Sequence, residues 1–120
     1  MAEIIKMPAN HKMKIVAYRP RAEVCRVHLS SRSNNADPWI TAFNADIGQN
    51  VHTDIDTYNH ITLQAVEIQF EAFVRTAQGE WGMLVTRYNY NDRVHFDCFT
   101  GPGQPANDPF LQVSFYPIRA

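Results

Sequence analysis

The 120-residue sequence contains only two cysteines and no long apolar run. Cys25 and Cys98 are too few for a disulfide scaffold, and each lies among apolar residues, so we expect buried free thiols, with one bridge between them as the alternative. No stretch approaches the ~20 apolar residues of a membrane span, and the N-terminus carries no signal-peptide run. We therefore expect no stable membrane insertion, and a protein that is cytoplasmic or released without a cleaved signal peptide.

Short motifs that carry catalysis or bind metals are also missing. The five histidines form no H-x-H or H-E-x-x-H pattern, no cysteine pair has zinc spacing, and no G-x-S-x-G elbow occurs. We expect no catalytic residues, no metal site, no cofactor and no enzymatic activity. Asp54 and Asp56 place oxygen ligands at alternate positions, as a calcium loop does, but the glycine and final glutamate of an EF-hand are absent. Calcium near these two residues is the alternative.

The net charge of −1 conceals an asymmetry. Seven of the eleven Lys and Arg residues lie within the first 32 positions, against two acidic residues there. Either this basic end lies across the acidic remainder, within the fold or in a neighbouring subunit, or it faces an anion. No zinc-finger or phosphate-loop pattern supports the second reading, and we expect no nucleic-acid partner.

The stretch 60–100 carries the strongest periodicity. Apolar residues alternate with polar ones from Ile61 to Val74, with a slip of one position at Ala65-Val66 that predicts a β-bulge. A turn at 77–80, a second strand over 81–90, a tight turn at Asn91-Asp92 and a third strand over 93–99 complete an antiparallel meander.

The rest of the chain also reads as short strands separated by turns. We expect strands over 3–7, 12–19, 22–30 and 110–118, a short strand over 39–43 that is buried on both faces, an irregular polar segment over 44–59, and a rigid loop over 101–109. Helical spacing is nearly absent. The sequence thus predicts an all-β fold: an antiparallel β-sandwich, jelly-roll-like or similar, of about eight strands in one domain over 1–120.

Aromatic and polar side chains gather around the last two turns. Sugar recognition needs flat aromatic faces for the apolar side of a pyranose, and amide, carboxylate and guanidinium groups for its hydroxyls. This stretch offers both kinds of group. The other reading is that the aromatic residues serve core and cross-strand packing. The candidate ligand-binding residues are Trp81, Tyr88, Tyr90, Asn91, Asp92 and Arg93.

The order Gly79-Glu80-Trp81, an alternating strand, then Tyr90-Asn91-Asp92-Arg93-Val94-His95 resembles the H-type lectins of invertebrates and slime moulds. That resemblance implies a small antiparallel sandwich that assembles as a trimer and binds galactose-type sugars near such a turn. The family places one tryptophan in the turn and another in the following strand, and this sequence departs from it there. The N-terminal third does not follow the family pattern either. No site residues are carried over.

From these features we expect a non-enzymatic, lectin-like carbohydrate-binding module that acts as a multivalent homo-oligomer, with glycans and further copies of itself as partners. Multivalency is expected because a single shallow sugar site binds weakly. The alternative is a structural or interaction protein of a viral, phage or toxin assembly, whose exposed aromatics are buried against protein. The sequence does not identify the sugar or the number of subunits.

Overall fold

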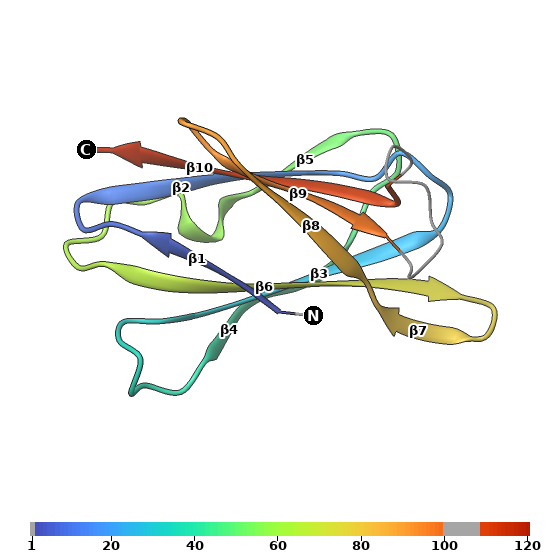
Figure 1. The fold of residues 1–120 in the computed structure, drawn as a ribbon, viewed down its shortest axis with the longest axis horizontal. Coiled ribbons are helices and arrows are strands. Elements are labelled where there is room, and N and C mark those ends of the chain that lie inside the picture. The colour runs from blue at the N-terminus through green and yellow to red at the C-terminus, as the bar shows by residue number, and fades with distance from the viewer. Residues whose placement is uncertain (1, 100–108) are drawn as a thin grey trace.

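Two antiparallel sheets packed face to face make up the computed structural model, which describes residues 2–99 and 109–120 (Figure 1). Alternating apolar residues give most strands one buried side, and the buried sides of the two sheets meet. The described strands are β1 (Glu3–Met7), β2 (His11–Tyr18), β3 (Val24–Arg32), β4 (Ile40–Ile47), β5 (His52–Ile55), β6 (Val66–Thr76), β7 (Gly79–Gly82), β8 (Leu84–Asn89), β9 (Val94–Phe99) and β10 (Leu111–Arg119).

Sheet A has the order β1-β6-β3-β4, and β7 pairs with the far end of β6. Sheet B has the order β5-β2-β10-β9-β8. The prediction of an all-β antiparallel sandwich is therefore confirmed, with ten strands among the described residues instead of about eight. No helix in the described part of the chain is long and apolar enough to cross a membrane.

Three phenylalanines join the sheets at the centre of the sandwich. Phe70 comes from sheet A, and Phe96 and Phe115 come from sheet B; all three are fully buried. The ring centroid of Phe70 lies 5.0 Å from that of Phe96 and 5.6 Å from that of Phe115, in tilted and edge-on geometries that aromatic pairs favour.

The two cysteines are free thiols buried in this core, as expected. Cys25 lies on β3 and Cys98 on β9, so the two sheets contribute one each. Burial raises the pKa of Cys25 to about 12 and also raises the pKa of Cys98. Both thiols are therefore protonated at neutral pH.

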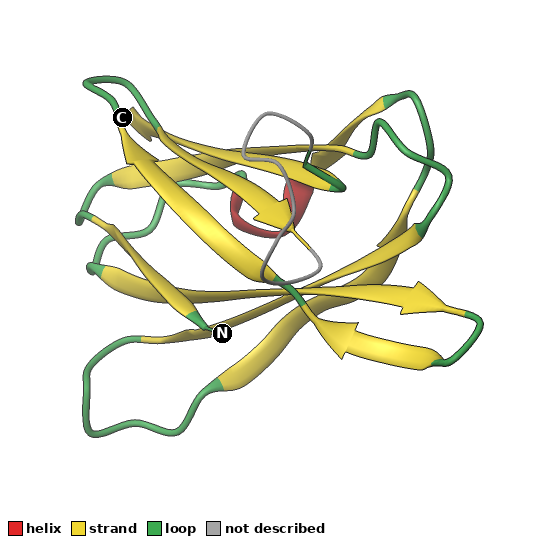
Figure 2. Cartoon of the chain, turned by 45° about the vertical axis from the view of Figure 1, so that its right-hand side comes forward, coloured by secondary structure: helices red, strands yellow, loops and turns green. Residues whose placement is uncertain are grey.

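The chain changes sheets where the sequence predicts one continuous strand over 81–90. Met83 is fully buried, and its N–H donates to the Ala72 carbonyl of β6 at 2.8 Å. β7 before it belongs to sheet A and β8 after it to sheet B (Figure 2). The predicted meander is wrong in this respect, because local alternation cannot show to which sheet a strand belongs.

Three other expectations for local structure are also wrong. β4 continues to Ile47 and is exposed over most of its length, whereas a short strand buried on both faces was expected. The segment expected to be irregular holds β5 and a helical turn at Asp56–Tyr58, drawn in red in Figure 2. β6 begins only at Val66, so residues 61–65 do not form the predicted strand with a bulge. The loop predicted over 101–109 lies outside the described residues except for Pro109.

Candidate functional site

The outer surface of sheet B carries most of the predicted binding residues. Phe96 on β9 and Phe115 on β10 point into the core, so the residues that alternate with them along each strand point away from it. Cross-strand pairing then sets Tyr88 beside His95, and His95 beside Ser114. We call this surface the B platform; its residues on β8, β9, β10 and their connecting turn are Thr86, Tyr88, Tyr90, Arg93, His95, Asp97, Gln112, Ser114 and Tyr116.

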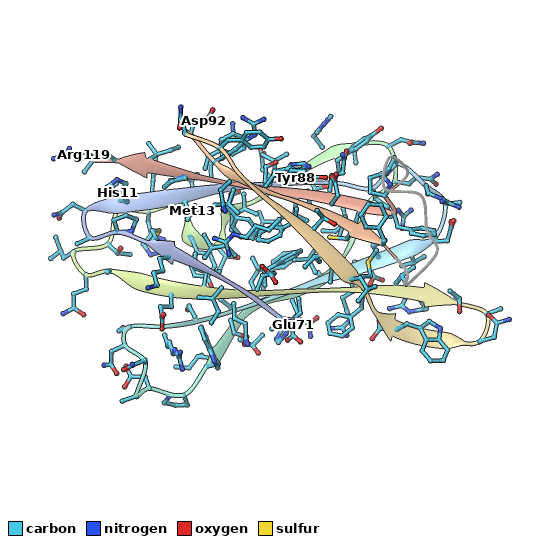
Figure 3. All side chains as sticks on the ribbon, viewed as in Figure 1. His11, Met13, Glu71, Tyr88, Asp92 and Arg119 are labelled. Carbon is cyan, nitrogen blue, oxygen red and sulfur yellow. The ribbon has the colours of Figure 1, made fainter. Side chains whose placement is uncertain are left out.

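At the β8–β9 hairpin the aromatic rings stand nearly parallel. The centroids of Tyr88 and Tyr90 are 6.4 Å apart, and the ring planes differ by 14°. Tyr88 is 37% exposed and Tyr90 is 50% exposed, so both rings are accessible at the surface. Figure 3 labels Tyr88, which lies on β8, and Asp92 at the tip of the hairpin, where the chain reverses.

The turn places charged and amide groups beside these rings. It is closed by the Tyr90 N–H, which donates to the Arg93 carbonyl at 2.9 Å. The Arg93 guanidinium carbon lies 4.4 Å from the centroid of the Tyr90 ring and 5.9 Å from that of Tyr116. Asp92 accepts a hydrogen bond from Arg93 Nη1 at 3.0 Å. Asn91 and Asp92, the tip residues, are exposed.

Trp81 is the exception among the six predicted residues. It lies on β7 in sheet A, opposite Val74, and its Nε1 donates to the Thr76 hydroxyl at 3.3 Å. Seven residues separate Trp81 from Tyr88, which corresponds to up to roughly 23 Å of extended chain. The structure therefore groups Tyr88, Tyr90 and the turn residues, and it places Trp81, which is 54% exposed, on a different sheet.

Sequence reasoning missed a hydrogen-bonded trio at the centre of the B platform. One ring nitrogen of His95, Nδ1, is 2.7 Å from Ser114 Oγ, and the other, Nε2, is 2.8 Å from Asp97 Oδ1. Asp97 also accepts a hydrogen bond from Gln112 Nε2 at 3.1 Å. Because a carboxylate only accepts, the neutral ring carries its proton on Nε2 and accepts the Ser114 hydroxyl proton on Nδ1.

The same three residue types occur in hydrolytic triads, but catalysis also needs N–H donors aimed at the developing oxyanion. The backbone N–H groups beside this trio belong to β9 and β10, which are paired on both sides within the sheet. The trio does hold both ring nitrogens of the imidazole, whose centroid lies 6.1 Å from that of Tyr88 with the ring planes 46° apart. The expectation of no enzymatic activity stays a prediction.

At the other end of sheet B a second aromatic pair extends the platform. The rings of Tyr18 on β2 and His52 on β5 stack with centroids 4.6 Å apart and planes 16° apart. In the sequence, Tyr116, Tyr18 and the central trio each alternate with buried residues, which marks them as outward-facing. This alternation could not group them into one surface, because it does not show which strands are neighbours.

Three hollows lie elsewhere on the surface. Two of them, of about 260 and 390 Å³, share Ser33 and Val66 and flank the β3–β4 connection. The third, of about 260 Å³, is lined by Asp54 and Asp56 together with Lys12 and Lys14. None of the three includes a B-platform residue, and the platform itself is the outer face of a sheet.

The lysines bear on the calcium alternative. Two ammonium groups in the same hollow as Asp54 and Asp56 oppose the binding of a cation there. Among the described residues no group of three or more His, Cys, Asp or Glu side chains could hold a metal ion. Calcium binding remains without support from the geometry.

Comparison with known proteins adds no assignment: no family model matches the chain, and no curated protein matches it.

Proposed function

We propose that the protein is a non-enzymatic carbohydrate-binding module whose ligand site is the tyrosine end of the B platform. The observation that carries this proposal is the nearly parallel, exposed pair of Tyr88 and Tyr90, with Arg93 over the second ring. Flat rings supply a surface for the apolar face of a pyranose. Asn91, Asp92 and Arg93 supply donors and acceptors for its hydroxyl groups.

The site is shallow, and this sets the affinity that we expect. A ligand that covers an open platform leaves much of its own surface in water, so one sugar ring binds weakly. Useful affinity then requires several sites in one particle. The proposed function therefore includes a homo-oligomer.

The test is a glycan array with labelled full-length protein, run with calcium and with chelator. We expect selective binding to one terminal sugar that persists in chelator. Titration of that free sugar would follow, with Tyr90→Ala as the site variant and Trp81→Ala as the matched control, since both side chains are about half exposed. If folded, oligomeric protein bound no glycan on the array, this result would contradict the proposal.

A second candidate function is an interaction protein within a larger assembly. It is favoured by apolar side chains that are exposed away from the B platform, notably Leu63 at 82% and Ile40 at 66%. Such residues are expected where another protein covers them. Self-association without any response to sugars would support this candidate.

A further inference from the structure

β4 is the exposed edge strand of sheet A. It pairs with β3 on one side and ends the sheet on the other, so its outward N–H and C=O groups face solvent. Over Ile40–Ile47 its sequence holds one charge, Asp46, and neither lysine nor proline. Soluble proteins usually protect an edge with charges, prolines or bulges, because a free edge templates pairing with another strand. β4 carries a bulge beside Leu29/Ser30 and little other protection.

The inward side of β4 also lacks full cover. Phe43 pairs with Leu29, and Ala45 pairs with Val27, and both of these β3 partners are fully buried. Phe43 and Ala45 therefore point to the core side of the sheet, yet Ala45 is exposed and Phe43 is only half-buried. In Figure 1 β4 lies at the lower margin of the molecule, beyond the strands of sheet B. Sheet B ends on this side with β5, which has four residues.

The other long edges are protected. On the opposite side of the sandwich, Arg87 of β8 donates through Nη1 to the Ile4 carbonyl of β1 at 2.8 Å and lies 3.7 Å from Glu3. This side chain ties the edges of the two sheets together. The chain itself crosses between the sheets next to this seam, at Met83. β4 is thus the long edge with the least protection in the described structure.

We propose that a second copy of this chain pairs antiparallel with β4 about a twofold axis perpendicular to sheet A. Such a contact is isologous, so each free donor on one copy meets the equivalent acceptor on the other. A twofold axis of this kind keeps inward side chains facing inward. A register centred on Asn44 sets Phe43 of one copy opposite Ala45 of the other, which covers both.

Charge also permits this pairing. Asp46 carries the charge of β4, and its carboxylate lies 3.3 Å from the Arg75 guanidinium of its own sheet. In the register centred on Asn44, Asp46 lies opposite Ala42 of the other copy, and the two Asp46 residues are about 13 Å apart along the strands. That separation exceeds the ~10 Å over which exposed charges interact at moderate salt.

The dimer would deepen the proposed function, and to that extent the inference rests on it. Because the axis is perpendicular to the sheets, the B platforms of both copies would face the same side. A surface that displays many copies of one sugar could then engage both sites at once. The pairing itself requires no sugar, so it can be tested separately.

The first experiment is light scattering coupled to gel filtration over a concentration series of the full chain. We expect a dimer for the unchanged protein, a monomer for Ala45→Lys, and a dimer for the matched control Leu63→Lys, which changes an exposed apolar residue outside β4. Circular dichroism checks that each variant folds. A monomeric unchanged protein at tens of micromolar, or a dimeric Ala45→Lys, would overturn the pairing.

If Ala45→Lys fails to fold, cysteine trapping gives a second test. In a register centred on Asn44 this residue faces its own twin, so Asn44→Cys should form a disulfide-linked dimer with oxidised glutathione. Leu63→Cys should not. Absence of the Asn44→Cys dimer under the same conditions refutes this register, and a similar yield from Leu63→Cys refutes specific pairing.

Sugar binding is measured on the same variants to separate the two proposals. Ala45→Lys should keep its affinity for free sugar but lose about a hundredfold in apparent affinity for a dense glycan surface. A dimer that binds no sugar would leave the pairing intact and refute the proposed function. Sugar binding by a protein that is always monomeric would refute the pairing alone.

Discussion

The two outer surfaces of the sandwich use their polar groups differently. On sheet A, charged side chains are paired with one another across strands: Arg26 contacts Glu80, and Arg32 contacts Glu67 at 2.9 Å. On the B platform the prominent side chains are tyrosines and the hydrogen-bonded trio of His95, Asp97 and Ser114, and the rings of Tyr88 and Tyr90 are exposed. These charged groups of sheet A are thus paired within the sheet, whereas the B platform leaves aromatic surface exposed.

The charge pattern of the sequence acquires an explanation from sheet A. Arg26 and Arg32 belong to the basic N-terminal part, and their partners Glu80 and Glu67 belong to the acidic remainder. Arg26 also covers the Phe73 ring, with its guanidinium carbon 4.1 Å from the centroid. For these residues, the reading in which the basic end lies across the acidic remainder within the fold is confirmed.

The largest expected effect comes from the core on which both sheets depend. Phe70→Ala deletes the ring that joins the sheets, and we expect a loss of about 3–5 kcal/mol in the free energy of unfolding, because little can collapse into the space. Urea unfolding followed by tryptophan fluorescence measures it. Phe73→Ala, on the outer surface of sheet A, should cost much less, about 1 kcal/mol. Equal losses would mean that the core described above does not hold the sheets together.

The next prediction concerns the pH dependence of stability, to which each sheet contributes one buried thiol. Unfolded thiols ionise above about pH 9, whereas the pKa of folded Cys25 is about 12, so the folded state holds its proton longer. Stability should therefore be complete below pH 9 and fall as pH rises towards 12, by about 1 kcal/mol per thiol at pH 10. The unfolding free energies of the unchanged protein and Cys25→Ala at pH 7 and pH 10 measure this. An identical pH dependence would contradict the burial of this thiol.

The next comparison sets an aromatic of the B platform against one of sheet A. Tyr90→Ala should weaken sugar binding about tenfold, since an aromatic contact contributes on the order of 1 kcal/mol. Trp81→Ala should leave it within twofold of the unchanged protein, because Trp81 lies on the other sheet. Isothermal titration with the free sugar measures both. The reverse result would move the site from the B platform to β7.

How far the sequence anticipates this arrangement depends on the kind of information involved. Alternation identified the buried sides of β2, β9 and β10 because every second residue is apolar there. It could not separate β7 from β8, since the break at Met83 depends on a hydrogen bond to Ala72 from a distant strand. The candidate site could be predicted only in part: Tyr88, Tyr90 and the turn are local in sequence, whereas Ser114 and Tyr116 lie beside them only through strand pairing.

The smallest expected effect tests whether the charged pairs of sheet A contribute more than those of the B platform. Arg26 donates to both carboxylate oxygens of Glu80, at 2.7 and 3.1 Å, and this hydrogen bonding lowers the pKa of Glu80. A lowered folded pKa gives stability that is present above the unfolded value of 4.5 and is lost as the pH falls through the folded pKa. Glu80→Gln should therefore cost up to about 1 kcal/mol at pH 7, and the difference should disappear in acid.

Asp92→Asn is the matched change in the β8–β9 turn, beside the B platform. It removes a contact of 3.0 Å to Arg93, but the Asp92 side chain is 69% exposed and solvent screens the pair. Its effect on the free energy of unfolding at pH 7 should be smaller than that of Glu80→Gln, while its effect on sugar affinity should be larger. Urea unfolding and sugar titration of both variants supply the four values. If Asp92→Asn changed stability more and affinity less, the charges of the β8–β9 turn would be structural, and the contrast between the two surfaces would fail at that turn.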